Sequence, residues 1–142
     1  MKKPFFLTST MAIVAFGVVA FPTARPAGSS PADTIERGRY LVQQVGLCGD
    51  CHTPHNEKGD PIADQALQGA NVFLKPMNPV PNWAEYTPAI AGFPGFTDEQ
   101  AVTFLTTGKD AGGQFAAPPM PQYRFSREDA VAVLSYLKSL KK

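Results

Sequence analysis

The chain has 142 residues, which suits one domain, and its 13 basic and 12 acidic residues leave a formal net charge of +1. This balance, without any basic stripe, argues against nucleic acid as a partner. Most of the 14 prolines and 12 glycines fall between residues 54 and 122, so that part of the chain has little core of its own. We therefore expect the domain to fold around something large and apolar.

Residues 1–20 have the layout of a secretory signal peptide. Lys2 and Lys3 precede an uncharged, mostly apolar run that ends at Ala20, where small residues offer a cleavage site. The run is a little short to span a membrane, which takes about 20 apolar residues, although an uncleaved segment would act as an anchor. The sequence thus predicts export to the periplasm, with a membrane as partner only if this segment is retained.

Residues 21–31 are predicted to form a linker, and residues 32–142 the folded domain. Ser30 is a typical helix N-cap and Gly46 a typical helix end, so we expect a helix over residues 31–45. Its apolar stripe repeats at a spacing near 3.6 residues. The stripe consists of Ile35, Gly38, Leu41, Val42 and Val45.

Residues 53–96 show no sustained period and are predicted to be loops and turns. A second helix is expected from the cap at Thr97 to the stop at Gly108, and a third from the cap at Ser126 to the end of the chain. The buried stripe of the third helix consists of Ala130, Val133, Leu134, Leu137 and Leu140. No strand pattern is convincing, so the sequence predicts an all-α fold in which the N- and C-terminal helices pack on each other.

The stretch "LCGDCHTPHNEKGD" holds every cysteine and histidine of the chain: Cys48, Cys51, His52 and His55. A disulfide between Cys48 and Cys51 would close a very small loop and add little stability. A thioredoxin-like redox pair normally follows a strand, whereas this motif follows a predicted helix. A zinc site would use the adjacent residues Cys51 and His52 together, although tetrahedral sites usually join two separated ligand pairs.

The remaining interpretation is C-x-x-C-H, the attachment signal for c-type haem. One helical turn separates Cys48 from Cys51, which places both sulfurs along one edge of the macrocycle for two thioether bonds. The next residue, His52, then projects its imidazole toward the iron. Export agrees with this interpretation, because haem is attached to such proteins outside the cytoplasm.

The second axial ligand is expected to be a methionine, or the position is open. His55 lies three residues from His52, and the segment is already committed to the proximal face. Outside the leader, the methionines are Met77 and Met120. We favour Met120, since three prolines stiffen its loop and a rigid loop holds a weak thioether at low entropic cost.

With these residues in hand, the chain resembles the class I monohaem cytochromes c. The motifs that carry the resemblance are "GRYLVQQVGLCGDCHTP", "PPMPQY" and "DAVAVLSYLKSL", spread over about residues 32–141. With "FTDEQAVTFLTTG" between them, the chain looks most like the cytochrome subunits and domains of periplasmic alcohol- and sugar-acid-oxidising dehydrogenases. The resemblance implies the class I fold, in which the terminal helices cross and loops wrap around one covalently bound haem.

The resemblance also implies residue roles. Cys48 and Cys51 would be the thioether sites, His52 the proximal ligand and Met120 the distal ligand. Where the terminal helices cross, Gly38 and either Tyr40 or Leu41 would pack against Leu134 and Leu137. We expect the haem pocket to be lined by Phe93, Phe96, Phe104, Phe115, Tyr123 and Phe125. Candidates for hydrogen bonds to the haem propionates are Trp83, Tyr86 and Arg124.

The sequence therefore predicts an exported carrier of single electrons rather than an enzyme. Its expected cofactor is one haem c, and its expected partners are redox proteins: a dehydrogenase, an oxidase or another cytochrome. It would work as a free carrier or as the electron-transfer subunit of a periplasmic dehydrogenase. The alternative is a gas-binding or peroxidatic haem protein with an open or displaceable distal position.

Overall fold

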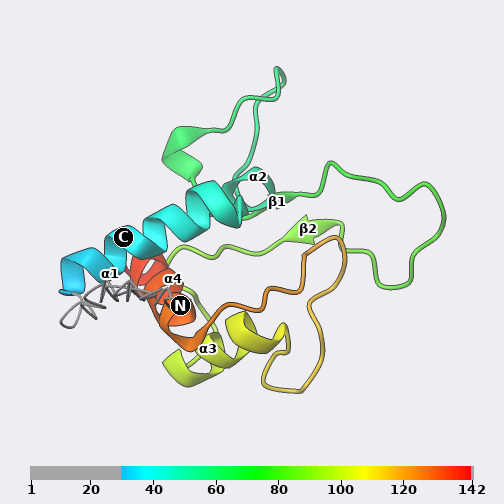
Figure 1. Ribbon diagram of the computed structural model, residues 1–142. Helices are drawn as coiled ribbons and strands as arrows, with labels where there is room; N and C mark the ends of the chain where they lie inside the picture. The colour runs from blue at the N-terminus through cyan, green and yellow to red at the C-terminus, as the bar shows by residue number, and fades with distance from the viewer. Residues whose placement is uncertain (1–29, 142) are drawn as a thin grey trace, which may run out of the picture.

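The computed structural model describes residues 30–141, so the predicted signal peptide and nearly all of the predicted linker lie outside the described residues. The elements in chain order are α1 (Pro31–Tyr40), the π-helical turn η1 (Leu41–Val45), α2 (Cys48–His52), the 3-10 turn η2 (Ala63–Gln65), β1 (Ala70–Asn71), β2 (Tyr86–Thr87), α3 (Asp98–Thr107) and α4 (Arg127–Ser139) (Figure 1). No helix among residues 30–141 is both long enough and apolar enough to cross a membrane.

The first predicted helix has the expected extent but two kinds of winding. The Ser30 hydroxyl accepts a hydrogen bond from the Asp33 amide, and the Asp33 carboxylate accepts one from the Ser30 amide, which completes a capping box. After α1 the chain continues as η1, and the Gly46 amide donates to the Leu41 carbonyl at 2.7 Å. The wider π turn rotates the last residues away from an ideal stripe, so Val45 is exposed where the spacing predicted burial.

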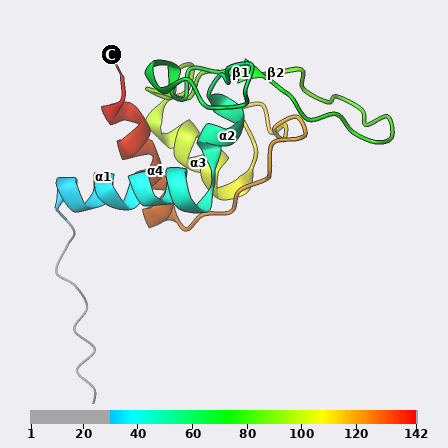
Figure 2. The same ribbon diagram turned by 90° about the horizontal axis from the view of Figure 1, so that it is seen from above.

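The N- and C-terminal helices lie against each other through their backbones (Figures 1 and 2). A Cβ atom placed on Gly38 would lie 1.9 Å from the carbonyl oxygen of Ala132 and 2.8 Å from the Tyr136 Cβ. The atoms nearest to Gly38 thus belong to Ala132 and Tyr136 of α4 rather than to the predicted Leu134 and Leu137. Only a residue without a side chain permits this approach.

Of the two residues proposed to accompany Gly38, the buried one is Leu41. It belongs to the same apolar cluster as Leu134 and Leu137. Tyr40 is 47% exposed and has the Arg37 guanidinium 5.7 Å from its ring centroid, so of the two alternatives Leu41 is the residue that packs in the core. The helical phase explains the difference, because consecutive residues point about 100° apart around a helix.

Helices α3 and α4 begin where their caps predict. Thr97 and Gln100 form a capping box, Gly108 ends α3 with a left-handed φ of 75°, and the Ser126 hydroxyl accepts from the Asp129 amide. Helix α4 stops at Ser139, three residues before the predicted end. The buried residues of α3 and α4 join those of α1 and η1 in one core.

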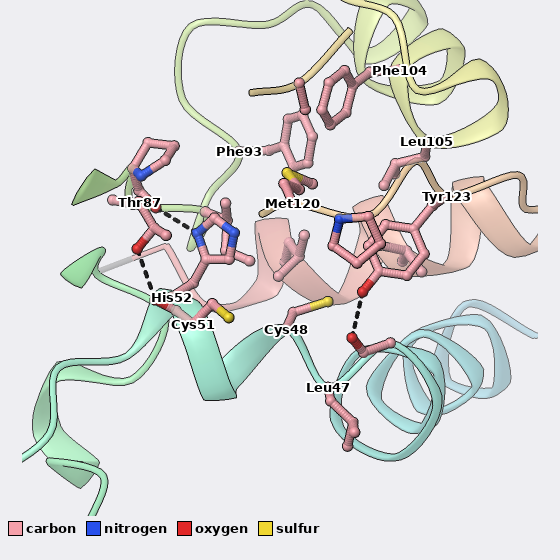
Figure 3. Close-up of a pocket in the computed structure, with 18 of the residues that line it drawn as sticks. Leu47, Cys48, Cys51, His52, Thr87, Phe93, Phe104, Leu105, Met120 and Tyr123 are labelled. Carbon is pink, nitrogen blue, oxygen red and sulfur yellow. Dashed lines mark hydrogen bonds between the residues drawn. The ribbon is translucent and has the colours of Figure 1, made fainter. Parts of the chain in front are cut away.

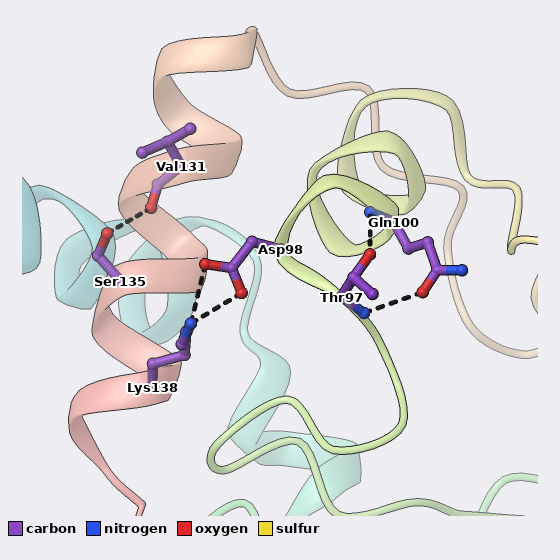
Figure 4. Close-up of polar contacts among 6 residues, drawn as sticks. All are labelled: Thr97, Asp98, Gln100, Val131, Ser135 and Lys138. Atoms are coloured by element: carbon purple, nitrogen blue, oxygen red, sulfur yellow. Dashed lines mark hydrogen bonds and ion pairs between the residues drawn. The ribbon is translucent and has the colours of Figure 1, made fainter.

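Two ion pairs connect the exposed rims of α3 and α4. Lys138 Nζ lies 2.7 Å from Asp98 Oδ1 (Figure 4), and Arg127 Nη2 lies 3.2 Å from Glu99 Oε2. All four side chains are about half exposed or more, so water screens both pairs. The core between the helices, rather than these charges, holds them together.

The long segment 53–96 is mostly loop, as expected, but it contains a short antiparallel ladder. Ala70 pairs with Thr87 and Asn71 with Tyr86, so the prediction of no strand is wrong for these two-residue strands. Between β1 and β2 the chain extends far out from the helices (Figures 1 and 2). The exposed apolar side chains of this extension are Phe73, Leu74, Met77 and Val80.

Candidate haem site

The C-x-x-C-H motif forms a single helical turn at the wall of a cavity (Figure 3). Leu47 precedes it in a left-handed conformation with φ 49°, which turns the chain sharply out of η1 and into α2. Both Cys48 and Cys51 carry free thiols, and both line the cavity. The predicted spacing of one turn therefore does bring the two sulfurs to the same face of α2.

His52 is held in one ring orientation by a backbone carbonyl. Its Nδ1 lies 2.7 Å from the Pro88 oxygen, and because a carbonyl only accepts, Nδ1 carries the proton and donates it. The residue is 6% exposed, and this burial lowers the pKa of His52, with a smaller opposing effect of the Pro88 hydrogen bond. A neutral ring protonated at Nδ1 leaves a lone pair on Nε2, which is the form that binds a metal ion.

Thr87, next to Pro88, ties the same loop to the motif. Its hydroxyl lies 2.7 Å from the Cys51 carbonyl and accepts a hydrogen bond from the Ala70 amide at 3.0 Å. Sequence reasoning missed Thr87 and Pro88, which lie 36 residues beyond the groups they bind. No local signal marks them, because a Thr-Pro pair at the end of a two-residue strand carries no pattern of its own.

The cavity has a volume of about 600 Å³ and predominantly apolar walls. Five of the six predicted aromatic residues line it, namely Phe93, Phe96, Phe104, Tyr123 and Phe125. The sixth prediction, Phe115, is wrong: this side chain is 48% exposed and lies under the Lys109 ammonium, 5.0 Å from its ring centroid. A cavity of this size and polarity suits a flat, largely apolar group of cofactor size.

The two candidate methionines lie in different places in the structure. Met120 lines the cavity that Cys48, Cys51 and His52 also line (Figure 3), whereas Met77 is fully exposed at the outer loop. The loop of Met120 is anchored at its start, where the Pro118 carbonyl accepts from the Ala84 amide at 2.7 Å. All four predicted site residues therefore meet at one cavity.

The three candidates for propionate contacts lie in different places, and His55 lies apart from the cavity. Of the candidates for propionate contacts, Tyr86 lines the cavity, but the Trp83 indole donates to the Leu74 carbonyl and Arg124 lies beside Gln122. His55 packs its ring against Phe73, with centroids 6.0 Å apart. Among residues 30–141, no three side chains of the Cys, His, Asp or Glu type cluster closely enough to hold a metal ion.

Tyr123 contributes a polar contact that sequence reasoning did not predict. Its hydroxyl donates to the Gly46 carbonyl, two residues before Cys48. Burial raises the pKa of Tyr123 to about 12 and the pKa of the Cys48 thiol to about 11, so both groups keep their protons at neutral pH. The sequence predicted only that the Tyr123 ring lines the pocket, because no local pattern indicates a hydrogen-bond partner 77 residues away.

The donor set fits a covalently held haem. Two thiols one helical turn apart lie beside a buried imidazole with a free Nε2, and a thioether lines the same apolar cavity. A helical domain that carries C-x-x-C-H on the wall of such a cavity has the features of a c-type haem protein.

Comparison with known proteins gives the family. The family model described as cytochrome c matches residues 35–141, and the chain belongs to the cytochrome c family. Membership implies a covalent haem c on the Cys48–His52 motif.

Several similar proteins are named as cytochrome subunits of dehydrogenases. The chain is 30% identical over 113 residues to the fructose dehydrogenase cytochrome subunit of Gluconobacter japonicus, an alignment that covers 76% of this chain and 22% of the relative. It is 30% identical over 116 residues to the cytochrome c subunit of the quinone alcohol dehydrogenase of Gluconobacter oxydans, covering 75% and 24%. For the gluconate 2-dehydrogenase cytochrome c subunit of Pantoea cypripedii, identity is 29% over 117 residues, covering 75% and 26%. The chain thus spans about a quarter of the length of these relatives.

Proposed function

We propose that residues 32–142 form a class I cytochrome c domain that carries single electrons through one His/Met-ligated haem. Cys48 and Cys51 are the thioether sites, and His52 and Met120 are the axial ligands. The observation that supports this most is that Met120 lines the His52 cavity while Met77 is fully exposed. The sequence has a single C-x-x-C-H, which corresponds to one haem and one electron per chain.

The chain's own residues tune the site in three ways. When bound, the haem supplies one-electron iron chemistry. The Pro88 carbonyl orients His52 and increases the basicity of its free nitrogen. A thioether from Met120 favours a higher reduction potential than a second nitrogen ligand would. The apolar walls exclude water, which keeps the dielectric constant around the haem low.

The same arrangement argues for a carrier rather than a catalyst. His52 and Met120 would both hold the iron, which would leave no coordination position for a substrate. The relatives are named as cytochrome subunits of dehydrogenases, so we propose that this chain exchanges electrons with a dehydrogenase, an oxidase or another cytochrome. Its proposed compartment is the periplasm, reached through the signal segment 1–20, with membrane attachment only if that segment is retained.

The first test compares the visible spectra of the ferric wild type, Met120→Ala and Met77→Ala. We expect the weak far-red sulfur-to-iron band in the wild type and in Met77→Ala, and its complete loss in Met120→Ala. Met77→Ala is the matched control, because it removes an equal side chain from the exposed loop. A wild-type spectrum without the band, together with rapid binding of carbon monoxide to the ferrous protein, would instead favour the gas-binding or peroxidatic alternative.

A second experiment separates a free carrier from a fixed subunit. The tagged protein is isolated from its native membranes and periplasm under mild conditions. Stoichiometric recovery of a dehydrogenase subunit identifies a complex, whereas recovery of the cytochrome alone identifies a free carrier. The interpretation of the haem site does not depend on this result.

A further inference from the structure

Tyr123 lies three residues after Met120, lines the same cavity and points its hydroxyl toward the turn at Leu47 (Figure 3). Its hydroxyl donates to the carbonyl of Gly46, the residue that ends the helical run α1–η1. Gly46 in turn is separated from Cys48 only by Leu47. One hydrogen bond thus joins the methionine loop to the turn that carries the cysteines.

The receiving end of this hydrogen bond is tightly packed. The Gly46 amide donates to the Leu41 carbonyl at 2.7 Å, which fixes the peptide group just before the one whose carbonyl accepts from Tyr123. A Cβ added to Gly46 would lie 3.1 Å from the Leu41 oxygen, 3.2 Å from Cys48 Sγ and 3.5 Å from the Tyr123 hydroxyl. The carbonyl that accepts the bond therefore has little freedom to move.

The donating end is restrained as well. The Tyr123 ring stacks on Phe125 with centroids 5.1 Å apart and planes 9° apart. Phe125 is anchored in turn, since its amide donates to the Leu105 carbonyl of α3 at 3.2 Å. Two loosely held partners would gain little from one hydrogen bond, but two restrained ones lose little entropy when they form it.

The remaining backbone bonds of the methionine loop lead elsewhere. The Met120 amide donates within the loop to Ala117, and the Pro118 carbonyl accepts from Ala84. The hydrogen bond from Tyr123 to Gly46 links residues 117–125 with residues 46–52, and the same hydroxyl also faces the Cys48 thiol. It is placed to resist movement of the Met120 sulfur away from the His52 side.

We propose that Tyr123 is a positioning residue that keeps the Met120 sulfur on the iron by tying the methionine loop to the cysteine turn through Gly46. This inference rests on the proposed function, because it takes Met120 as the distal ligand. Tyr123 does not touch the iron. It acts through the position of its loop.

The test uses Tyr123→Phe, which keeps the ring and its stack on Phe125 and removes only the hydroxyl. The matched control is Tyr136→Phe, whose hydroxyl accepts from Gln43 Nε2 at 2.8 Å and so joins α4 to η1 without any contact to the methionine loop. Both variants lose one hydrogen bond between distant parts of the chain. Only Tyr123→Phe loosens the loop of Met120.

The readout is the rate at which carbon monoxide binds to the ferrous protein, since the gas takes the distal position only after the sulfur has left it. We expect this rate to rise about two- to tenfold in Tyr123→Phe, the range that follows from the loss of one hydrogen bond. In Tyr136→Phe it should stay within experimental error of the wild type. Global unfolding in guanidinium is measured in parallel, and it should shift to lower concentrations in both variants.

The outcomes separate this inference from the function beneath it. If the wild type lacks the far-red band, the His/Met assignment fails and Tyr123 has no sulfur to position. If the wild type has the band but Tyr123→Phe binds carbon monoxide no faster than Tyr136→Phe, the positioning role is wrong and the ligand assignment stands. Should Tyr123→Phe fail to mature, Gly46→Ala perturbs the same contact from its other end, and an unchanged rate there would equally overturn the inference.

Discussion

The molecule has two regions that are closed in different ways. The helical frame, which consists of α1, η1, α3 and α4, is held by direct packing of its helices, although some of its side chains, such as Phe104 and Leu105, also line the cavity. The loop shell, which consists of residues 53–96 and 109–125, turns apolar side chains toward a cavity of about 600 Å³. The most completely buried large side chains among residues 30–141, Leu137, Val42 and Val133, all belong to the frame.

This difference teaches where the haem contributes to stability. In the frame, apolar area is already removed from water, so the helices need no cofactor to hold their contact. In the shell, the apolar walls remove water from their surfaces only when a group of matching size fills the space between them. We expect the frame to be an intrinsic property of the chain and the shell to depend on the haem.

The largest effect should follow from preventing covalent attachment with the double substitution Cys48→Ala and Cys51→Ala. We expect that no haem remains with the polypeptide after extraction into acidified organic solvent, whereas the wild type retains all of it. Hydrogen exchange on the haem-free variant should then show amides of α1 and α4 still protected and shell amides, such as Gly69 and Ile90, exchanging rapidly. If the amides of both regions were equally protected from exchange, the shell would not depend on the haem more than the frame does.

Within the helical frame, the largest loss of stability should follow from a substitution where α1 crosses α4. Gly38→Ala places a methyl group 1.9 Å from the Ala132 carbonyl oxygen, a backbone atom that moves only with α4. We expect the free energy of unfolding to fall by about 3 kcal/mol or more, at the upper end of what overpacking costs. Guanidinium denaturation followed by circular dichroism measures this change.

Gly49→Ala is the control for the crossing. Gly49 lies in α2, and its nearest heavy atom for an added Cβ is the Thr53 hydroxyl at 3.7 Å, which is ordinary contact. The substitution should change stability by no more than about 1 kcal/mol, in the stabilising direction, since alanine favours a helix over glycine. If the two alanine variants unfolded alike, the crossing would not depend on close backbone approach.

A smaller effect is expected where the shell joins the haem-attachment turn. Thr87→Val keeps the shape of the side chain but removes the hydroxyl that serves the Cys51 carbonyl and the Ala70 amide. Leaving buried backbone groups without partners should cost about 1–3 kcal/mol. Denaturation monitored by the haem absorption should show this loss. Thr103→Val, at an exposed position on α3, serves as the control and should leave the curve nearly unchanged.

The smallest effect should come from the ion pair at the rim of the frame. Lys138→Met separates Asp98 from its partner, but both side chains are largely exposed to water (Figure 4). We expect a loss below about 1 kcal/mol, which shrinks further as salt is added. Thermal melts at low and high ionic strength test this expectation, and a large, salt-independent loss would show that charge rather than packing holds α3 to α4.

Local signals determined most of the helical frame. The caps at Ser30, Thr97 and Ser126 bond to amides three residues away, so a short stretch of sequence already contains both partners. The same holds for Cys48 and Cys51, whose spacing of one turn is a property of α2 alone. The winding of η1 was not predictable in this way, because a π turn has the same apolar residues as the α-helix it replaces.

What only the tertiary structure decided depends on partners far apart in the chain. Gly38 was recognisable as a contact glycine, but its partners Ala132 and Tyr136 follow from the angle at which two helices meet. The Pro88 carbonyl lies 36 residues from His52, and Gly46 lies 77 residues from Tyr123. The sequence by itself thus determined the elements and the chemistry of the motif, because those bonds are local. Three features required the folded chain: the orientation of the imidazole, the placement of Met120 in the cavity with Met77 outside it, and the hydrogen bond from Tyr123 to Gly46. Loops bring these groups together, and loops have no periodic pattern that a sequence displays.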